Sequence, residues 1–121
     1  MKGTVISTII LSIIIVLLVI NSIVLNGFSK HLLETVDKIS DEPSEAIAET
    51  KKLYQHWEKW EPYISITVIH PEVETVRTAV TQMLKYAETD EKSEFILSKA
   101  LFKNAITHIR FSGEVSLETI L

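Results

Sequence analysis

The chain contains no cysteine, which excludes disulfide bonds, thiolate chemistry and zinc sites built on cysteine. It also has only three glycines and three prolines among its 121 residues. An all-β domain needs more such residues, because glycine and proline favour the tight turns between short strands. We therefore expect the part of the chain that lies in water to be helical.

Beyond the N-terminus, acidic residues outnumber basic ones. Apart from Lys2, the remaining 11 of the 12 lysines and arginines follow residue 26, where all 16 aspartates and glutamates also lie. Proteins that bind nucleic acid present clustered positive charge, and a domain that lies flat on anionic lipid needs it as well. The composition therefore argues against nucleic acid as a partner and against a domain that lies flat on anionic lipid.

The first residues form a long apolar run. No charged side chain occurs from Gly3 to Ser29, and the 21 residues 5–25 are almost wholly Ile, Val and Leu. As a helix, this run spans roughly 31 Å, which matches the ~30 Å hydrocarbon core of a bilayer. We interpret residues 1–27 as a transmembrane anchor that contacts the bilayer through residues 5–25, and residues 28–121 as a helical extracytoplasmic domain.

Two other interpretations of this run are open. A chain this short could hardly enclose such a helix on every face, which argues against a buried core helix. A cleaved secretory signal has an apolar region of about 7–15 residues followed by small residues at the cleavage site. The best candidate site here, at residues 27–29, lies too far downstream. We therefore favour an uncleaved anchor.

The orientation of the anchor is weakly encoded. The positive-inside rule counts lysine and arginine, and Lys2 on one flank nearly balances Lys30 and Lys38 on the other. A short N-terminal tail with one lysine commonly stays in the cytoplasm. We expect a single-pass protein of the cell membrane with its C-terminal domain outside the cytoplasm.

The anchor is expected to continue into a stalk, because apolar residues recur at steps of three and four up to Ile39. Pro43 ends this helix, and Asp41 or Ser44 is expected to cap the next one. The side chains expected on the buried face of that helix are Ile47, Leu53, Tyr54, Trp57 and Trp60.

Pro62 is expected to kink or interrupt this second helix. Residues 63–69 alternate like a strand, but no other segment offers a pairing strand, so we expect them to be helical. A third helix is expected to start at His70 and Pro71, because proline suits the first helical turn. Its predicted buried stripe is Val73, Val76, Val80, Met83, Leu84 and Ala87.

A turn at residues 89–90 is expected to lead into a last long helix that ends by Ser112 and Gly113. The apolar tail of residues 115–121 is expected to fold back and dock between helices, with a C-terminal recognition peptide as the alternative. The predicted fold is all-α, an N-terminal transmembrane helix that continues into an antiparallel bundle of three to four helices.

Several segments resemble a known family in their order and spacing. They are the N-terminal span, residues 57–60 (WEKW), His70 after an apolar run, residues 106–109 (ITHI) and the closing residues 116–121 (SLETIL). The chain resembles a family of small single-span bacterial membrane proteins, found mainly in Gram-positive spore formers and described only as a domain of unknown function. The resemblance covers nearly the whole chain and implies a small helical domain without an assigned enzyme activity.

Few residues are candidates for chemistry. The sequence has no glycine-rich phosphate loop, no G-x-S-x-G motif and no paired acids at metal spacing, so we expect no catalytic residues, no cofactor and no enzyme activity. If the last two helices form a hairpin about residues 89–90, His70 and His108 lie at the same end. With Glu72 they are weak candidates for a three-ligand zinc site or a pH sensor. The alternative is that both histidines only favour helix ends.

The remaining aromatic and histidine residues are expected to be structural. His31 and His56 are interpreted as solvated surface, and Trp57 and Trp60 as core, with a membrane-interface belt as the alternative. The function we expect is that of a membrane-anchored accessory or scaffold protein that interacts with another envelope protein. The second hypothesis is a small-ligand, metal or pH-sensing binding module that uses His70 and His108.

Overall fold

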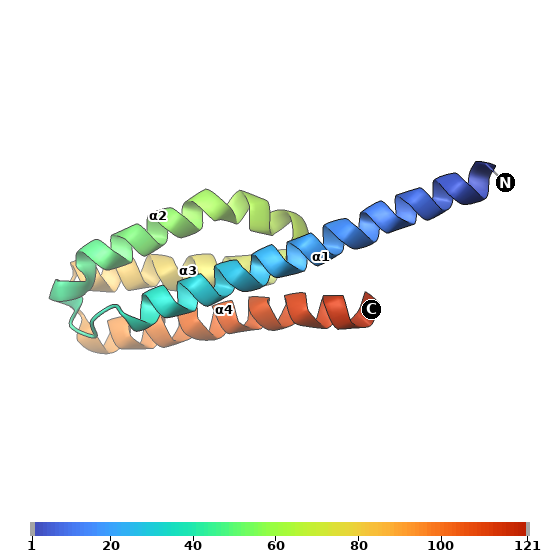
Figure 1. Cartoon of the computed structure of the whole chain (residues 1–121). Helices are drawn as coiled ribbons and strands as arrows, with labels where there is room; N and C mark the ends of the chain where they lie inside the picture. Colours follow the sequence, from blue (N-terminus) through green and yellow to red (C-terminus); the bar gives the residue numbers. More distant parts are fainter. Residues whose placement is uncertain (1, 121) are drawn as a thin grey trace.

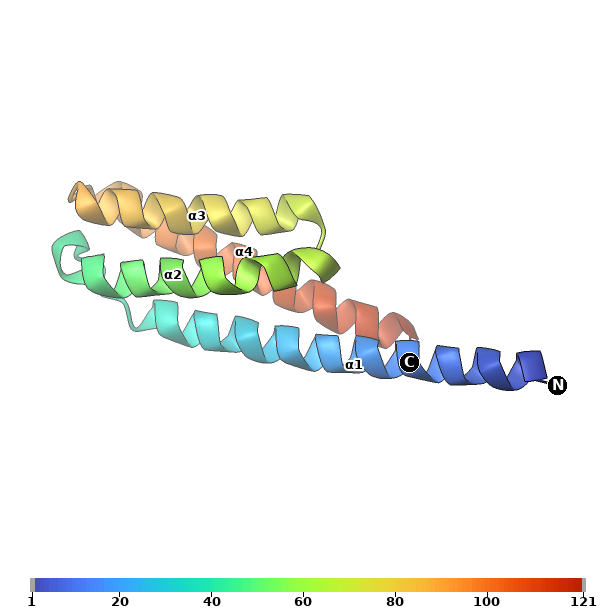
Figure 2. The same cartoon turned by 90° about the horizontal axis from the view of Figure 1, so that it is seen from above.

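The computed structural model describes the backbone of residues 2–120 and the side chains of residues 2–66 and 68–109. Within this range the chain forms four helices and no strand, as predicted. Figures 1 and 2 show an antiparallel bundle from one end of which the first part of helix α1 projects. The helices are α1 (Lys2–Asp37), α2 (Pro43–Thr67), α3 (His70–Glu88) and α4 (Lys92–Ile120).

Helix α1 is continuous from its projecting part into the bundle, as the expected stalk requires. Its buried residues recur at alternating steps of three and four, which is the spacing of a coiled-coil seam. They are Ser22, Leu25, Ser29, Leu32 and Val36. Helix α4 packs along α1 and shows the same spacing at its buried residues Phe95, Ser98, Phe102, Ala105, Ile106 and Ile109.

Helix α3 lies between α2 and α4 and packs against both. Val73, Val76, Val80, Met83 and Ala87 are all fully buried, which confirms most of the predicted stripe. Helices α1 and α2 pack against each other more weakly than the pairs α1–α4, α2–α3 and α3–α4 do. The side of the bundle between α1 and α2 is therefore comparatively loose.

The buried face of α2 agrees with the prediction at Leu53 and Trp57, is only half-buried at Tyr54 and Trp60, and differs from the prediction at its start. Ile47 is exposed, and the small residues Ala46 and Thr50 are buried in its place. The buried set continues with Leu53, Trp57 and Ile64 at helical spacing. The prediction followed the largest side chains. Pro43 is also buried, three residues before Ala46, so the buried face at the start of α2 includes Ala46 and not Ile47.

The expected interruption at Pro62 does not occur, because α2 continues through this residue to Thr67. The predicted helical conformation is therefore confirmed for residues 63–67. A proline inside a helix leaves the carbonyl of the residue four positions earlier unbonded. Pro62 and Glu58 both lie on the exposed face, where water can satisfy that carbonyl. Figure 1 shows that α2 curves in its second half.

The connections at the far end of the bundle are fixed by polar contacts. Neither Asp41 nor Ser44 caps α2, which begins at Pro43 with Glu42 as its N-cap residue. Ser40 Oγ accepts a hydrogen bond from the Glu42 amide at 3.1 Å instead. Lys99 Nζ reaches across from α4 and donates to the carbonyl of Ile39 at 2.5 Å. The α3–α4 turn lies at the predicted place and holds Asp90 at a φ of 54°.

The end of α4 contradicts the predicted fold-back of the tail. The helix does not stop at Ser112 and Gly113 but continues to Ile120. Glycine inside a helix costs about 1 kcal/mol relative to alanine, and extension preserves the backbone hydrogen-bond ladder at that modest cost. Both views place these last turns beside α1 (Figures 1 and 2). The side-chain contacts of the tail, and with them its predicted docking between helices, lie outside the described residues.

Helix α1 contains a stretch that is long and apolar enough to cross a membrane. Most large side chains of this stretch are about half exposed, from Val5 at 59% to Ile23 at 64%, whereas Ile15 and Val19 are half-buried. In Figures 1 and 2 the first turns of α1 extend beyond the other helices, and no other element covers them.

Candidate functional site

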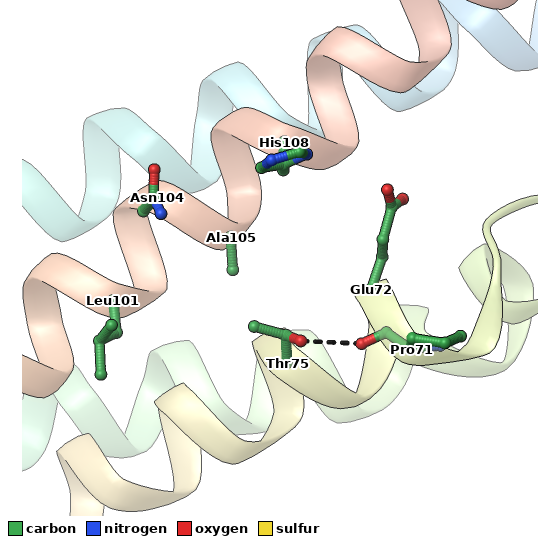
Figure 3. Close-up of a pocket in the computed structure, with 7 residues that line it drawn as sticks. All are labelled: Pro71, Glu72, Thr75, Leu101, Asn104, Ala105 and His108. Carbon is green, nitrogen blue, oxygen red and sulfur yellow. Dashed lines mark hydrogen bonds between the residues drawn. The ribbon is translucent and has the colours of Figure 1, made fainter.

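A groove of about 250 Å³ lies between the start of α3 and the middle of α4. Figure 3 shows its lining residues, with Thr75 donating a hydrogen bond of 2.8 Å to the carbonyl of Pro71. Most of the lining is apolar, and polar groups from both helices lie at its edge. The residues that line it are Pro71, Glu72, Thr75, Leu101, Asn104, Ala105 and His108.

The groove contains two of the three residues named as metal candidates. Glu72 extends from the first turn of α3 toward α4, and His108 comes from the facing part of α4 (Figure 3). The hairpin geometry therefore brings Glu72 and His108 to one site, as the equal arm lengths suggested.

His70 does not share this site. Its side chain is 76% exposed, and its Nε2 lies 4.0 Å from Glu74 Oε1. Over the side chains that the structure describes, no group of three histidine, aspartate or glutamate residues is arranged to hold a metal ion. The geometry therefore offers Glu72 and His108 as a polar pair in a groove rather than three ligands around a point.

A second polar group joins α2 to α3. Arg77 donates to Glu61 Oε1 through Nε at 2.6 Å and to Glu74 Oε1 through Nη1 at 3.0 Å. The buried Trp57 also donates its indole N–H to Glu61 Oε1, at 3.0 Å. The hydrogen bond from Arg77 lowers the pKa of Glu61 below its ordinary value, although partial burial opposes this shift. Sequence reasoning missed this group, because a contact across 16 residues depends on how the helices pack.

Rings from α1 and α2 form a cluster along the loose side of the bundle. We call Phe28, His31, His56, Trp60 and Tyr63 the aromatic seam. Phe28 contacts Trp60 with ring centroids 5.3 Å apart and His56 at 5.6 Å. His31 and His56 lie edge to face at 5.5 Å. Trp60 and Tyr63 lie edge to face at 5.9 Å.

The aromatic seam corrects one interpretation and confirms another. His56 was expected on the solvated surface but is half-buried, whereas His31 is exposed as expected. Burial lowers the pKa of His56 below its ordinary value, and the nearby charges of His31 and Lys59 act in the same direction. Trp57 is fully buried, which confirms its core position.

Exposed apolar side chains gather at two further places among the described residues. Leu97 and Leu101 are 61% and 46% exposed on the outer surface of α4, and Leu101 also lines the groove. We call residues 63–69, which end α2 and lead into α3, the apolar turn. In it, Ile66 is 79% exposed and Ile69 is 65% exposed.

The comparisons with known proteins identify a family and assign no activity. No curated protein and no solved structure matches the chain. The profile of one family, described as a domain of unknown function (DUF4363), matches residues 19–120. The match begins within α1 and covers the four packed helices, so the chain belongs to the DUF4363 family.

Proposed function

We propose that the protein is fixed in the cell membrane by α1 as a single-span anchor and that its bundle, outside the cytoplasm, binds another envelope protein. In this role it is an accessory or scaffold protein without chemistry of its own. The observation that carries the proposal is the groove between α3 and α4, together with the exposed leucines beside it.

The position of the groove favours a partner in the same membrane. His70 and the first turn of α3 lie at the end of the bundle from which α1 projects (Figures 1 and 2). A groove at this end opens sideways, close to the surface in which α1 would be embedded. Confinement of two proteins to one membrane raises their effective concentration, so a modest contact area suffices for association.

The chemistry of the groove fits a protein segment. Exposed leucines supply the apolar contact that anchors an interface, and Glu72, Asn104 and His108 supply polar groups at its rim. The hypothesis of a metal or small-ligand module that uses His70 and His108 stays a prediction. The arrangement favours it less, because His70 is exposed and does not line the groove.

Site-specific photocrosslinking in native membranes tests the proposal. A photoreactive amino acid at the exposed groove position Asn104 is expected to capture one membrane protein reproducibly. Leu101→Glu places a charge in the groove and is expected to abolish the capture. Ile96→Glu is the matched control, because Ile96 has a similar exposure on the same helix and does not line the groove, so capture is expected to persist.

Two outcomes would contradict the proposal. One is a crosslinking pattern at Asn104 that Leu101→Glu leaves unchanged. The other is recovery of the mature chain as a processed soluble form that begins near Lys30, which would remove the anchor.

A further inference from the structure

We propose that the end of the bundle formed by the apolar turn is immersed in the bilayer interface, with Ile66 and Ile69 inserted among lipid acyl chains. The occupant of this exposed apolar surface is then the membrane itself. The inference rests on the proposed function, because it assumes that α1 spans the bilayer, and it adds a second point at which the bundle contacts lipid.

The first argument is the length of the free part of α1. Coverage by the rest of the protein begins at the half-buried Ile15 and Val19 and is complete at Ser22, which recur on one face of the helix. The 13 residues 2–14, which precede this coverage, rise roughly 20 Å as a helix, whereas a hydrocarbon core is ~30 Å thick. About seven more residues are needed to span it, so the bilayer must extend to about residue 21.

The second argument is the level of the apolar turn along α1. Helices α1 and α2 are antiparallel, and the rings of Phe28 and Trp60 lie side by side at 5.3 Å. Six residues beyond Trp60 in α2 correspond to six residues before Phe28 in α1. Ile66 is therefore level with residue 22, at the edge of the segment that the bilayer must cover. Figures 1 and 2 likewise place the α2–α3 turn beside α1 at the end from which α1 projects.

The third argument is the chemistry of the turn. Residues 63–69 read YISITVI and carry no charge, so their entry into lipid desolvates no ionised group. The nearest preceding charge, Glu61, is already paired with Arg77. Trp60 and Tyr63 lie next to this segment on α2, and such amphipathic rings favour the headgroup level of a bilayer. An interface contact of this kind needs no basic patch, which agrees with the acidic composition.

The lack of native cysteine allows a direct test with single-cysteine variants of the full chain in nanodiscs of phosphatidylcholine and phosphatidylglycerol. The variants are Ile66→Cys, Ile69→Cys, Leu97→Cys and Leu11→Cys, each labelled with an environment-sensitive fluorophore. Leu97 is the matched control for Ile69, because its exposure is similar and it lies near the far end of the bundle. Spin-labelled lipid and aqueous iodide serve as the two quenchers.

Labels at 66 and 69 are expected to be quenched by spin-labelled lipid about twofold or more above the label at 97, as for other interfacial side chains. The label at 97 is expected to be quenched mainly by iodide. If the label at 11 is lipid-quenched while those at 66 and 69 behave like 97, the immersed turn is wrong and the anchor stands. If the label at 11 is itself quenched by iodide, the membrane anchor fails, and this inference fails with it.

Discussion

Glu61 in α2 accepts one hydrogen bond from the indole of Trp57 in the same helix and another from the guanidinium of Arg77 in α3. The carboxylate is mostly buried, and Arg77 is nearly half exposed, so the pair lies at the edge of the core. Hydrogen bonds to a charged group contribute more than neutral ones, and solvent screening at Arg77 reduces that contribution. At the scale of single residues, this carboxylate is the strongest polar link between α2 and α3 among those described.

Glu61→Gln keeps the size of the side chain and removes its charge. We expect the free energy of unfolding at pH 7 to fall by about 1–2 kcal/mol. Urea denaturation of the full chain in detergent, followed by circular dichroism, measures this change. Glu74→Gln is the control, because Glu74 is exposed and contacts the same Arg77, so its loss is expected to cost less than about 0.5 kcal/mol.

The lowered pKa of Glu61 also determines in which direction the free energy of unfolding changes with pH. Its pKa in the folded protein is below its ordinary value of 4.5, so the stabilisation is present at neutral pH. The stabilisation is lost as the pH falls below that value, because the unfolded chain then takes up a proton at this carboxylate more readily than the folded protein does. The difference between wild type and Glu61→Gln is therefore expected to shrink below about pH 4.5, and a constant difference down to pH 3 would contradict this assignment.

At the scale of elements, the contact between α1 and α2 is looser than the α1–α4, α2–α3 and α3–α4 contacts and consists largely of the aromatic seam. His56 faces Phe28 and Trp60 as well as His31, and Lys52 lines the same pocket as both histidines. Protonation of His56 would place a cation against His31, Lys52 and Lys59 in a partly apolar setting. The seam is therefore expected to weaken in acid.

The lowered pKa of His56 means that the unfolded chain binds a proton more readily than the folded one. Stability is therefore expected to fall as the pH drops below the ordinary value of 6.5. His56→Phe keeps a ring in the seam and is expected to flatten the dependence of the melting temperature on pH between about 6.5 and 5. His31→Gln removes one neighbouring cation and is expected to reduce the slope only in part, since burial is the larger cause. Thermal scans across this range measure both, and an unchanged slope in His56→Phe would rule the seam out as the origin.

At the scale of the whole molecule, α1 belongs both to the segment that projects from the bundle and to the bundle itself. Its first part is an apolar rod outside the bundle, and its second part supplies one side of the core through Ser22, Leu25 and the residues that follow. The boundary between the projecting part of α1 and the bundle therefore lies inside a continuous helix. We therefore expect a deletion that ends before Ser22, the first buried residue of α1, to affect the stability of the bundle less than a deletion that extends past it.

Two deletions separate these roles. Removal of residues 2–14 is expected to leave the melting temperature of the bundle nearly unchanged, because these residues precede the first coverage of α1. Removal of residues 2–27 also takes away Leu25, whose burial stabilises the fold by roughly 1.5–3 kcal/mol. Thermal denaturation of both chains in the same detergent, followed by circular dichroism, tests this, and equal melting temperatures would show that the bundle begins after residue 27.

The four helices, the long apolar run and the places of the turns could be predicted from the sequence alone. These features follow from local properties, namely the spacing of apolar residues, the few prolines and the length of the uncharged segment. The same local rules failed where a helix continues past a residue that disfavours it. Helix α2 passes Pro62 because that residue faces solvent, and α4 passes Gly113 because extension keeps its backbone bonded.

Only the tertiary structure decided which side chains meet. A shift of one residue turns a helical face by about 100°, so the burial of Ala46 in place of Ile47 required the packed bundle. For the same reason His56 joined Phe28 in the aromatic seam, and Glu72 rather than His70 shared the groove with His108. The sequence placed both histidines at one end of a hairpin, but the direction of each side chain depended on the rotation of two helices against each other.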